Sequence, residues 1–235
     1  MDTQRGPLAL VGSGEYLPQM EPVERALLRG RGHLYIQLAT AAAPEGPRSL
    51  DRWHRLGAEA AQRLGAEQVI VDVRDRADAD RPELASLVRG AGLIYLSGGN
   101  PTYLAETLRG TLVWQAIAHE WSEGAALAGC SAGAMALADH VVHPLRPQHG
   151  VAGLGAVPGV RIIPHFDRWA GRLPDLALRP WTGGSQILLG IDEDTALVGG
   201  PHEWTVHGRG CVWWLHREGR VAYAAGQQLD LRAAR

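Results

Sequence analysis

The sequence predicts an α/β fold, a three-layer sandwich whose mostly parallel central sheet is flanked by helices, with β-hairpins towards the C-terminal end. Strand-like and helix-like segments alternate between Leu8 and Leu137, and the strand-like segments are continuous apolar runs. Short strand-like runs separated by turn residues follow from Val160 onwards. Alternating segments with fully apolar strands are typical of a parallel sheet that helices cover on both faces.

The first part of the chain supplies the strands and helices of this sandwich in turn. The apolar runs 8–11, 33–38, 68–73, 92–96 and 125–128 are expected to be strands. The expected helices are 22–28, a helix capped by Ser49 and ending near Leu64, 82–88, a helix that begins at Pro101, 111–123 and 134–138. Proline in the first turn and serine at the N-cap are both favoured, because the first N–H groups of a helix have no partner within it.

The second part of the chain has the spacing of hairpins. Its strand-like runs are 160–163, 187–191, 196–198, 205–207, 212–215 and 221–224, and glycine-containing turns such as 207–210 separate them. We expect these hairpins to extend the central sheet within a single domain, residues 1–235. Residues 139–159 are rich in Gly, Pro and His, and they are expected to form a long surface loop or flap.

Composition narrows the classes of protein. With 23 Lys and Arg against 25 Asp and Glu the net charge is −2, so the basic surface of a nucleic-acid binder is absent. No apolar run approaches the roughly 20 residues that a membrane span needs. The two cysteines make no disulfide framework, which favours a cytoplasmic protein. We expect no nucleic-acid partner, no membrane partner, no cofactor and no metal, and a homodimer is left open.

One motif carries catalytic chemistry, because residues 129–133 fit the pattern G-x-S-x-G. A serine on a tight turn between a strand and a helix needs small neighbours, and the turn holds its hydroxyl out for attack. The strand 125–128 and the helix 134–138 supply that context. We therefore expect Ser131 to be a nucleophile, with the Ala132 N–H near a developing oxyanion. The alternative is a turn of small residues with no catalytic role.

A nucleophilic serine needs a base, and the base needs an orienting acid. His165 is a candidate base because it follows an expected strand end, 162–164, and active sites collect at such ends in parallel sheets. The run Asp192-Glu193-Asp194 also follows an expected strand. The residues alone leave the choice among these three carboxylates open.

Two glycine-containing turns follow other expected strands. The segment 97–100, Ser-Gly-Gly-Asn, would allow a second backbone N–H to approach an oxyanion, and Asn100 is expected to contact substrate. Gly12-Ser13-Gly14 lacks the third glycine of a dinucleotide loop, so it is a weak signal. Cys130 is expected to be a small buried residue beside the nucleophile.

Together these segments resemble the serine peptidase family of dipeptidase E and cyanophycinase, over nearly the whole chain. The stretches that carry the resemblance are VGSGEYL (11–17), LSGGNPTYL (96–104), AGCSAGAMAL (128–137), PHF (164–166) and GIDEDTAL (190–197). The resemblance implies a fold like that of class I glutamine amidotransferases, with serine in place of the cysteine nucleophile. It also implies Ser131 as nucleophile, His165 as base, Glu193 as third triad member, and the Gly99 and Ala132 N–H groups as oxyanion hole. The order Ser, His, Glu along the chain differs from that of α/β-hydrolases.

The substrate expected from this resemblance is a short peptide, cleaved through an acyl-enzyme. Cyanophycinases have Asp-Gln before the catalytic histidine and a run of arginines after it, whereas here Ile163-Pro164 precede His165, which argues against cyanophycin as the substrate. Arg168 and Arg172 follow at three and seven residues and are expected to bind an acidic residue at the cleaved bond. The alternatives are an amidohydrolase or esterase that uses the same serine, and a catalytically silent binding domain.

Overall fold

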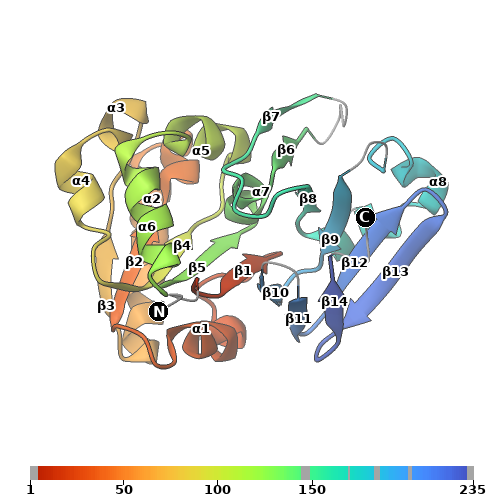
Figure 1. Ribbon diagram of the computed structural model, residues 1–235, viewed down its shortest axis with the longest axis horizontal. Coiled ribbons are helices and arrows are strands. Elements are labelled where there is room, and N and C mark those ends of the chain that lie inside the picture. Colours follow the sequence, from red (N-terminus) through yellow and green to blue (C-terminus); the bar gives the residue numbers. More distant parts are fainter. Residues whose placement is uncertain (1–4, 144–148, 169, 183–185, 201–202, 232–235) are drawn as a thin grey trace.

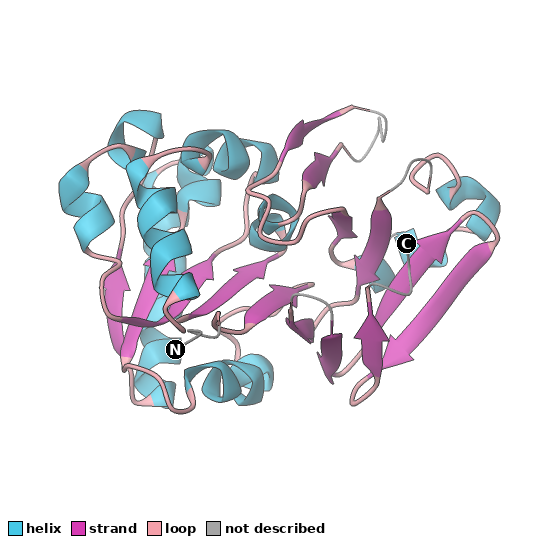
Figure 2. Cartoon of the chain, in the orientation of Figure 1, coloured by secondary structure: helices cyan, strands magenta, loops and turns pink. Residues whose placement is uncertain are grey.

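Helices cover both faces of a large central sheet, and a smaller sheet adjoins it (Figure 1; Figure 2). The computed structural model describes residues 5–143, 149–168, 170–182, 186–200 and 203–231. The predicted α/β class, with a mostly parallel central sheet and C-terminal hairpins, is confirmed. Among the described residues, no helix has the length and apolar character that crossing a membrane requires.

The central sheet has eight strands in the order β14-β11-β10-β1-β5-β4-β2-β3. These are β1 (Leu8–Val11), β2 (Leu34–Leu38), β3 (Glu67–Ile70), β4 (Ala91–Leu96), β5 (Ala126–Cys130), β10 (Thr195–Gly199), β11 (Glu203–Gly208) and β14 (Gln228–Asp230). Strands β1, β5, β4, β2 and β3 run parallel to their neighbours, whereas β10, β11 and β14 add an antiparallel extension. The five parallel strands therefore all end at one edge, where the functional groups of such sheets collect.

The helices form the two outer layers. Helices α1 (Glu21–Leu28) and α2 (Pro47–Leu64) cover one face, and α3 (Arg76–Ala79), α4 (Pro82–Ser86), α5 (Pro101–Leu108), α6 (Leu112–Ser122) and α7 (Ala132–Leu137) cover the other. Successive side chains of a strand point to opposite faces, so Leu8 and Leu10 pack in one core cluster while Ala9 and Val11 pack in the other. Burial on both faces explains why these strands are continuous apolar runs.

A second sheet corrects part of the prediction for the C-terminal hairpins. Strands β8 (Val160–Ile163), β9 (Ile187–Ile191), β12 (Cys211–His216) and β13 (Gly219–Ala224) form a separate sheet of order β13-β12-β9-β8, against which the short helix α8 (Asp175–Leu178) lies. Of the described strands after residue 160, β10, β11 and β14 extend the central sheet. The expectation that all the hairpins would extend it was wrong, because an apolar run does not specify which strand it pairs with. Strands β8 and β9 are parallel neighbours, so their carboxyl ends lie side by side.

Two local predictions also needed correction. Residues 139–159 are not a loop throughout, since β6 (His140–Val142) and β7 (Gly150–Ala152) pair as a hairpin in which Val141 and Val142 are buried. Residues 144–148 of that segment lie outside the described residues. Ser49 is not the cap of α2. The helix begins at Pro47, whose fixed φ suits the first helical position, and the Ser49 hydroxyl donates to Glu45 Oε2 at 2.6 Å.

Candidate active site

Ser131 lies at the turn between β5 and α7, with backbone angles of φ 50° and ψ −108°. Residues other than glycine rarely adopt a positive φ, and such strain is typical of functional turns. The turn also depends on small neighbours. A Cβ on Gly129 would lie 2.5 Å from the Gly133 carbonyl carbon, and one on Gly133 would lie 2.2 Å from Leu96 O. The G-x-S-x-G spacing is thus required by the close approach of β5, α7 and β4.

His165 lies between Ser131 and Glu193. Its Nε2 is 2.9 Å from Ser131 Oγ, and its Nδ1 is 3.0 Å from Glu193 Oε1. An ionised carboxylate can only accept a hydrogen bond, so Nδ1 carries the proton and Nε2 is left to accept the proton of the serine hydroxyl. The three side chains follow β5, β8 and β9, and these strands come from two different sheets.

The structure separates the three neighbouring carboxylates that the residues alone left equivalent. Asp192 Oδ2 accepts the Cys211 N–H at 2.8 Å, and its Oδ1 accepts the Trp213 indole N–H at 2.9 Å. Burial is the main cause that raises the pKa of Asp192. Asp194 Oδ1 accepts the Gln19 amide at 3.4 Å. Glu193 is therefore the carboxylate that contacts the histidine, while its two neighbours bind other parts of the chain.

Glu193 is itself held by two residues of the segment after His165. The Nε of Arg168 is 2.8 Å from Glu193 Oε2, on the carboxylate oxygen that His165 does not use. Asp167 Oδ1 accepts the Glu193 backbone N–H at 2.9 Å. Arg168 thus forms an ion pair with the carboxylate that contacts His165. Arg172 is exposed in a short 3₁₀ helix, Ala170–Arg172. The substrate role predicted for these arginines stays a prediction.

The expected oxyanion donors come from two segments, the turn after β4 and the start of α7. Ala132 is the first residue of α7, and the N–H groups at the start of a helix have no partner within it. Gly99 has φ 138°, and a Cβ there would lie 2.4 Å from Ala41 O, so only glycine fits this backbone. The Asn100 N–H donates to Ala41 O at 2.7 Å, which fixes the turn. The Asn100 side chain accepts the Tyr103 N–H at 3.0 Å as the cap of α5, so its Oδ1 is engaged within the protein.

Sequence reasoning missed Glu15, a buried residue beside the turn that carries Ser131. Its Oε1 accepts the Gly98 N–H at 3.1 Å, and its Oε2 accepts the Cys130 thiol at 2.8 Å. This buried carboxylate therefore contacts the residue before Gly99 and the residue before Ser131. The available signal is a charged residue directly after the glycine turn 12–14, inside the stretch VGSGEYL that carries part of the resemblance. Burial, followed by the nearby Glu15, raises the pKa of Cys130 well above its ordinary value, so this thiol is a poor nucleophile.

A cavity of about 700 Å³ opens beside His165. Gly99 and Asn100 line it, together with Met135 of α7, Ile162 of β8 and Trp181. The expected base and an expected oxyanion donor both line it, so this cavity is the candidate substrate site. Arg168 and Arg172 are not among the described residues that line it.

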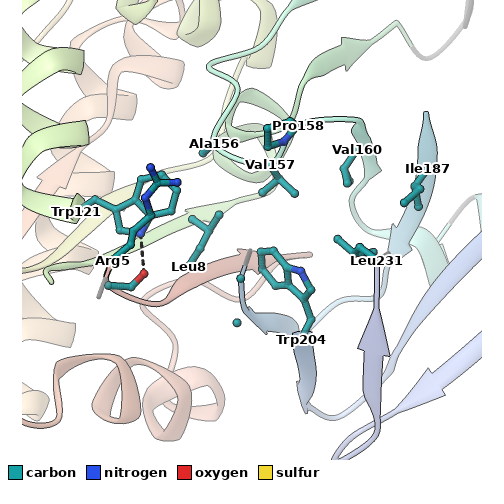
Figure 3. Close-up of a pocket in the computed structure, with 13 residues that line it drawn as sticks. Arg5, Leu8, Trp121, Ala156, Val157, Pro158, Val160, Ile187, Trp204 and Leu231 are labelled. Carbon is teal, nitrogen blue, oxygen red and sulfur yellow. Dashed lines mark hydrogen bonds between the residues drawn. The ribbon is translucent and has the colours of Figure 1, made fainter. Parts of the chain in front are cut away.

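A second cavity, of about 310 Å³, lies away from these groups (Figure 3). Leu8 of β1, Val157 and Trp204 of β11 line it, and Arg5 stacks on Trp121 at its rim, 4.5 Å from the ring centroid. It contains none of the candidate catalytic residues. In the part of the chain that the structure describes, no group of three His, Cys, Asp or Glu side chains is placed to hold a metal ion.

Comparisons with known proteins find a peptidase family and several relatives. The profile of peptidase family S51 matches residues 47–205. The chain is 29% identical to a cyanophycinase of Trichormus variabilis over 197 residues, and 33% identical to one of Synechococcus elongatus over 184 residues. These matches cover 78% and 72% of this chain, but the chain spans only 63% and 56% of the length of those relatives.

Two solved structures have a similar fold. A peptidase from an acI-B1 actinobacterium superposes with a TM-score of 0.88 at 40% identity, covering 98% of both chains. A putative peptidase E protein from Listeria monocytogenes superposes with a TM-score of 0.63 at 18% identity, covering 87% of this chain and 99% of that one, a likeness that concerns the fold alone.

Proposed function

The chain belongs to peptidase family S51, and from this membership we propose that it is a serine peptidase that hydrolyses short peptides through Ser131, His165 and Glu193. The single observation that carries the proposal is the unbroken contact from Ser131 Oγ to His165 Nε2 and from His165 Nδ1 to Glu193 Oε1, at 2.9 and 3.0 Å. A nucleophile, a base and an orienting acid in hydrogen-bond reach are the groups that acyl transfer needs.

In the proposed first half-reaction, Ser131 Oγ attacks the carbonyl carbon of the peptide bond while His165 Nε2 takes the hydroxyl proton. The negative charge that forms on the carbonyl oxygen is stabilised by the Gly99 and Ala132 N–H groups. Collapse of this intermediate breaks the C–N bond, and His165 gives the proton to the leaving amine. The product is an ester between Ser131 and the acyl part of the substrate.

Water completes the proposed cycle. His165 Nε2 takes a proton from a water molecule that attacks the ester, and the same proton returns to Ser131 Oγ as the acid is released. Glu193 stabilises the imidazolium that forms in both half-reactions, and it keeps Nδ1 protonated. Arg168 and Asp167 act on this scheme as positioning residues, because they fix the carboxylate and the backbone of Glu193.

An acidic residue at the cleaved bond remains a prediction from Arg168 and Arg172. The cavity beside His165 gives it no support, since the guanidinium of Arg168 contacts Glu193 and neither arginine lines the cavity. An amidohydrolase or esterase would use the same groups, so the nature of the substrate has to come from experiment.

A pool of dipeptides and tripeptides, incubated with the purified protein and analysed by mass spectrometry, tests the proposal. We expect new free amino termini with the wild type and none with Ser131→Ala. The Ser122→Ala protein is a matched control, because this half-buried serine donates to the His119 carbonyl, at 2.7 Å, and contacts none of the candidate catalytic residues in the described structure. Equal cleavage by the Ser131→Ala protein, or cleavage of esters and amides but of no peptide, would reject the proposed function.

A further inference from the structure

The walls of the cavity beside His165 are mainly apolar. Met135 of α7, Val142 of β6 and Ile162 and Ile163 of β8 line it together with Trp181. Its volume of about 700 Å³ lies within the roughly 300–1,000 Å³ that small-molecule sites occupy. An apolar side chain that enters is removed from water on several sides, which is favourable in proportion to the apolar area buried.

The described residues of the cavity wall carry few charged groups. Of the described residues that line it, none is Arg or Lys. Glu45 is the acidic residue on the wall, and the Ser49 hydroxyl donates to its Oε2 at 2.6 Å. The nearest arginine in sequence to His165, Arg168, contacts Glu193 instead. A carboxylate side chain in the cavity would lose water and face Glu45, and both effects are unfavourable. Among the described wall residues the cation would have to be an imidazolium, of His143 or of His165, and His165 is neutral when it acts as the proposed base.

The cavity also has the right position to receive the substrate residue next to the cleaved bond. Gly99, an expected oxyanion donor, and His165, the proposed base, both belong to its wall. A carbonyl group attacked by Ser131 lies between these two groups in the proposed reaction. The side chain on one side of the cleaved bond is then directed into the cavity.

Resting on the proposed peptidase function, we propose that this cavity selects a bulky apolar side chain beside the cleaved bond, so that the substrates are short apolar peptides and not acidic ones. Removing or adding a single methylene in an apolar pocket changes kcat/KM by roughly 10- to 200-fold. Exchange of leucine for the similarly sized aspartate, which adds a charge, is therefore expected to lower kcat/KM at least tenfold.

The experiment compares peptides that carry Leu, Asn or Asp at either side of the cleaved bond, because these side chains have nearly the same shape. We expect kcat/KM to fall from Leu to Asn to Asp at one of the two positions. Met135→Lys puts a cation on the wall and should lower the Leu-to-Asp ratio tenfold or more. Leu176→Lys is the matched control, because Leu176 is 68% exposed and does not line the cavity. If Met135→Lys does not fold, Thr102→Lys places a cation on the same wall.

Labelling of Ser131 by a fluorophosphonate, run in parallel, separates failure of this inference from failure of the proposed function. The apolar specificity is wrong if the labelled protein prefers Asp to Leu or does not distinguish them. It is also wrong if the labelled protein cleaves none of these peptides. An unchanged Leu-to-Asp ratio of kcat/KM in a folded Lys variant also contradicts it. If Ser131 is not labelled and no peptide is cleaved, the proposed function fails as well.

Discussion

Substitution of Glu193 by glutamine tests the part of the triad that sequence alone left open. The change removes the negative charge 3.0 Å from His165 Nδ1 and keeps the size of the side chain. It also leaves the guanidinium of Arg168, now 2.8 Å from a carboxylate oxygen, beside a neutral amide. Both effects disfavour the imidazolium that forms when Ser131 attacks, so kcat should fall.

The size of the effect follows from the geometry. Two unit charges 3.0 Å apart attract by about 5 kcal/mol at an effective dielectric constant of about 20. The side chains of His165 and Glu193 are 36% and 30% exposed, so water screens this attraction. A charged hydrogen bond is worth about 1.5–3 kcal/mol net, which corresponds to a loss in kcat of roughly tenfold to 150-fold. An amide that turns its NH₂ towards Nδ1 would impose the wrong tautomer and increase the loss towards about 10⁴-fold.

The assay is kcat for one cleaved peptide, measured for Glu193→Gln and for the neighbouring exchange Asp194→Asn. Asp194 has φ 51°, a conformation that asparagine tolerates well, so this control should fold and keep nearly full activity. Asp192→Asn should instead lower thermal stability, because the Asp192 carboxylate accepts N–H groups of Cys211 and Trp213. The reasoning is refuted if Glu193→Gln keeps wild-type kcat, or if either aspartate exchange slows the folded enzyme more.

Three further predictions concern Gly99, Glu24 and Cys130. Gly99→Ala should lower kcat by roughly 10²- to 10³-fold, because a Cβ 2.4 Å from Ala41 O must displace the expected oxyanion donor; unchanged kcat would show that this N–H has no part in the reaction. Burial raises the pKa of Glu24 from 4.5 to about 7, so folding favours its protonated form; this contribution is complete below about pH 4.5 and is lost as the pH rises through 7, about 3 kcal/mol in all. Urea unfolding at pH 4 and pH 8 should show that loss in the wild type and a flatter profile in Glu24→Gln, and equal pH profiles would contradict it. Iodoacetamide should leave activity intact because Cys130 is buried and its pKa is raised, whereas inactivation that Cys130→Ala abolishes would point to a thiol nucleophile.

Local signals account for the parts of the fold and site that the sequence predicts well. Burial on two faces requires the apolar runs of β1, β2, β4 and β5. The tight turn requires the small residues around Ser131. His165 and Glu193 follow strand ends, but only the family resemblance chose Glu193 over its two neighbours.

The remaining features depend on contacts between segments far apart in the chain. The apolar runs of β8 and β9 look like those of the central sheet, although they pair in a second sheet. Glu15 contacts Gly98 and Cys130, which lie 83 and 115 residues away. Arg168 contacts Glu193 because β8 and β9 are parallel neighbours, a pairing that the sequence does not express.

Labelling by a fluorophosphonate probe, followed by peptide mapping, tests the central claim most directly. Such probes react with a serine that an adjacent base activates, and the 2.9 Å contact with His165 Nε2 predicts that Ser131 is this serine. The account predicts one adduct, on the peptide that contains Ser131, no adduct in the Ser131→Ala protein, and turnover there reduced by roughly four to six orders of magnitude. Labelling of the Ser131→Ala protein to the same extent as the wild type, or an adduct on another residue such as Ser97 or Cys130, would contradict it.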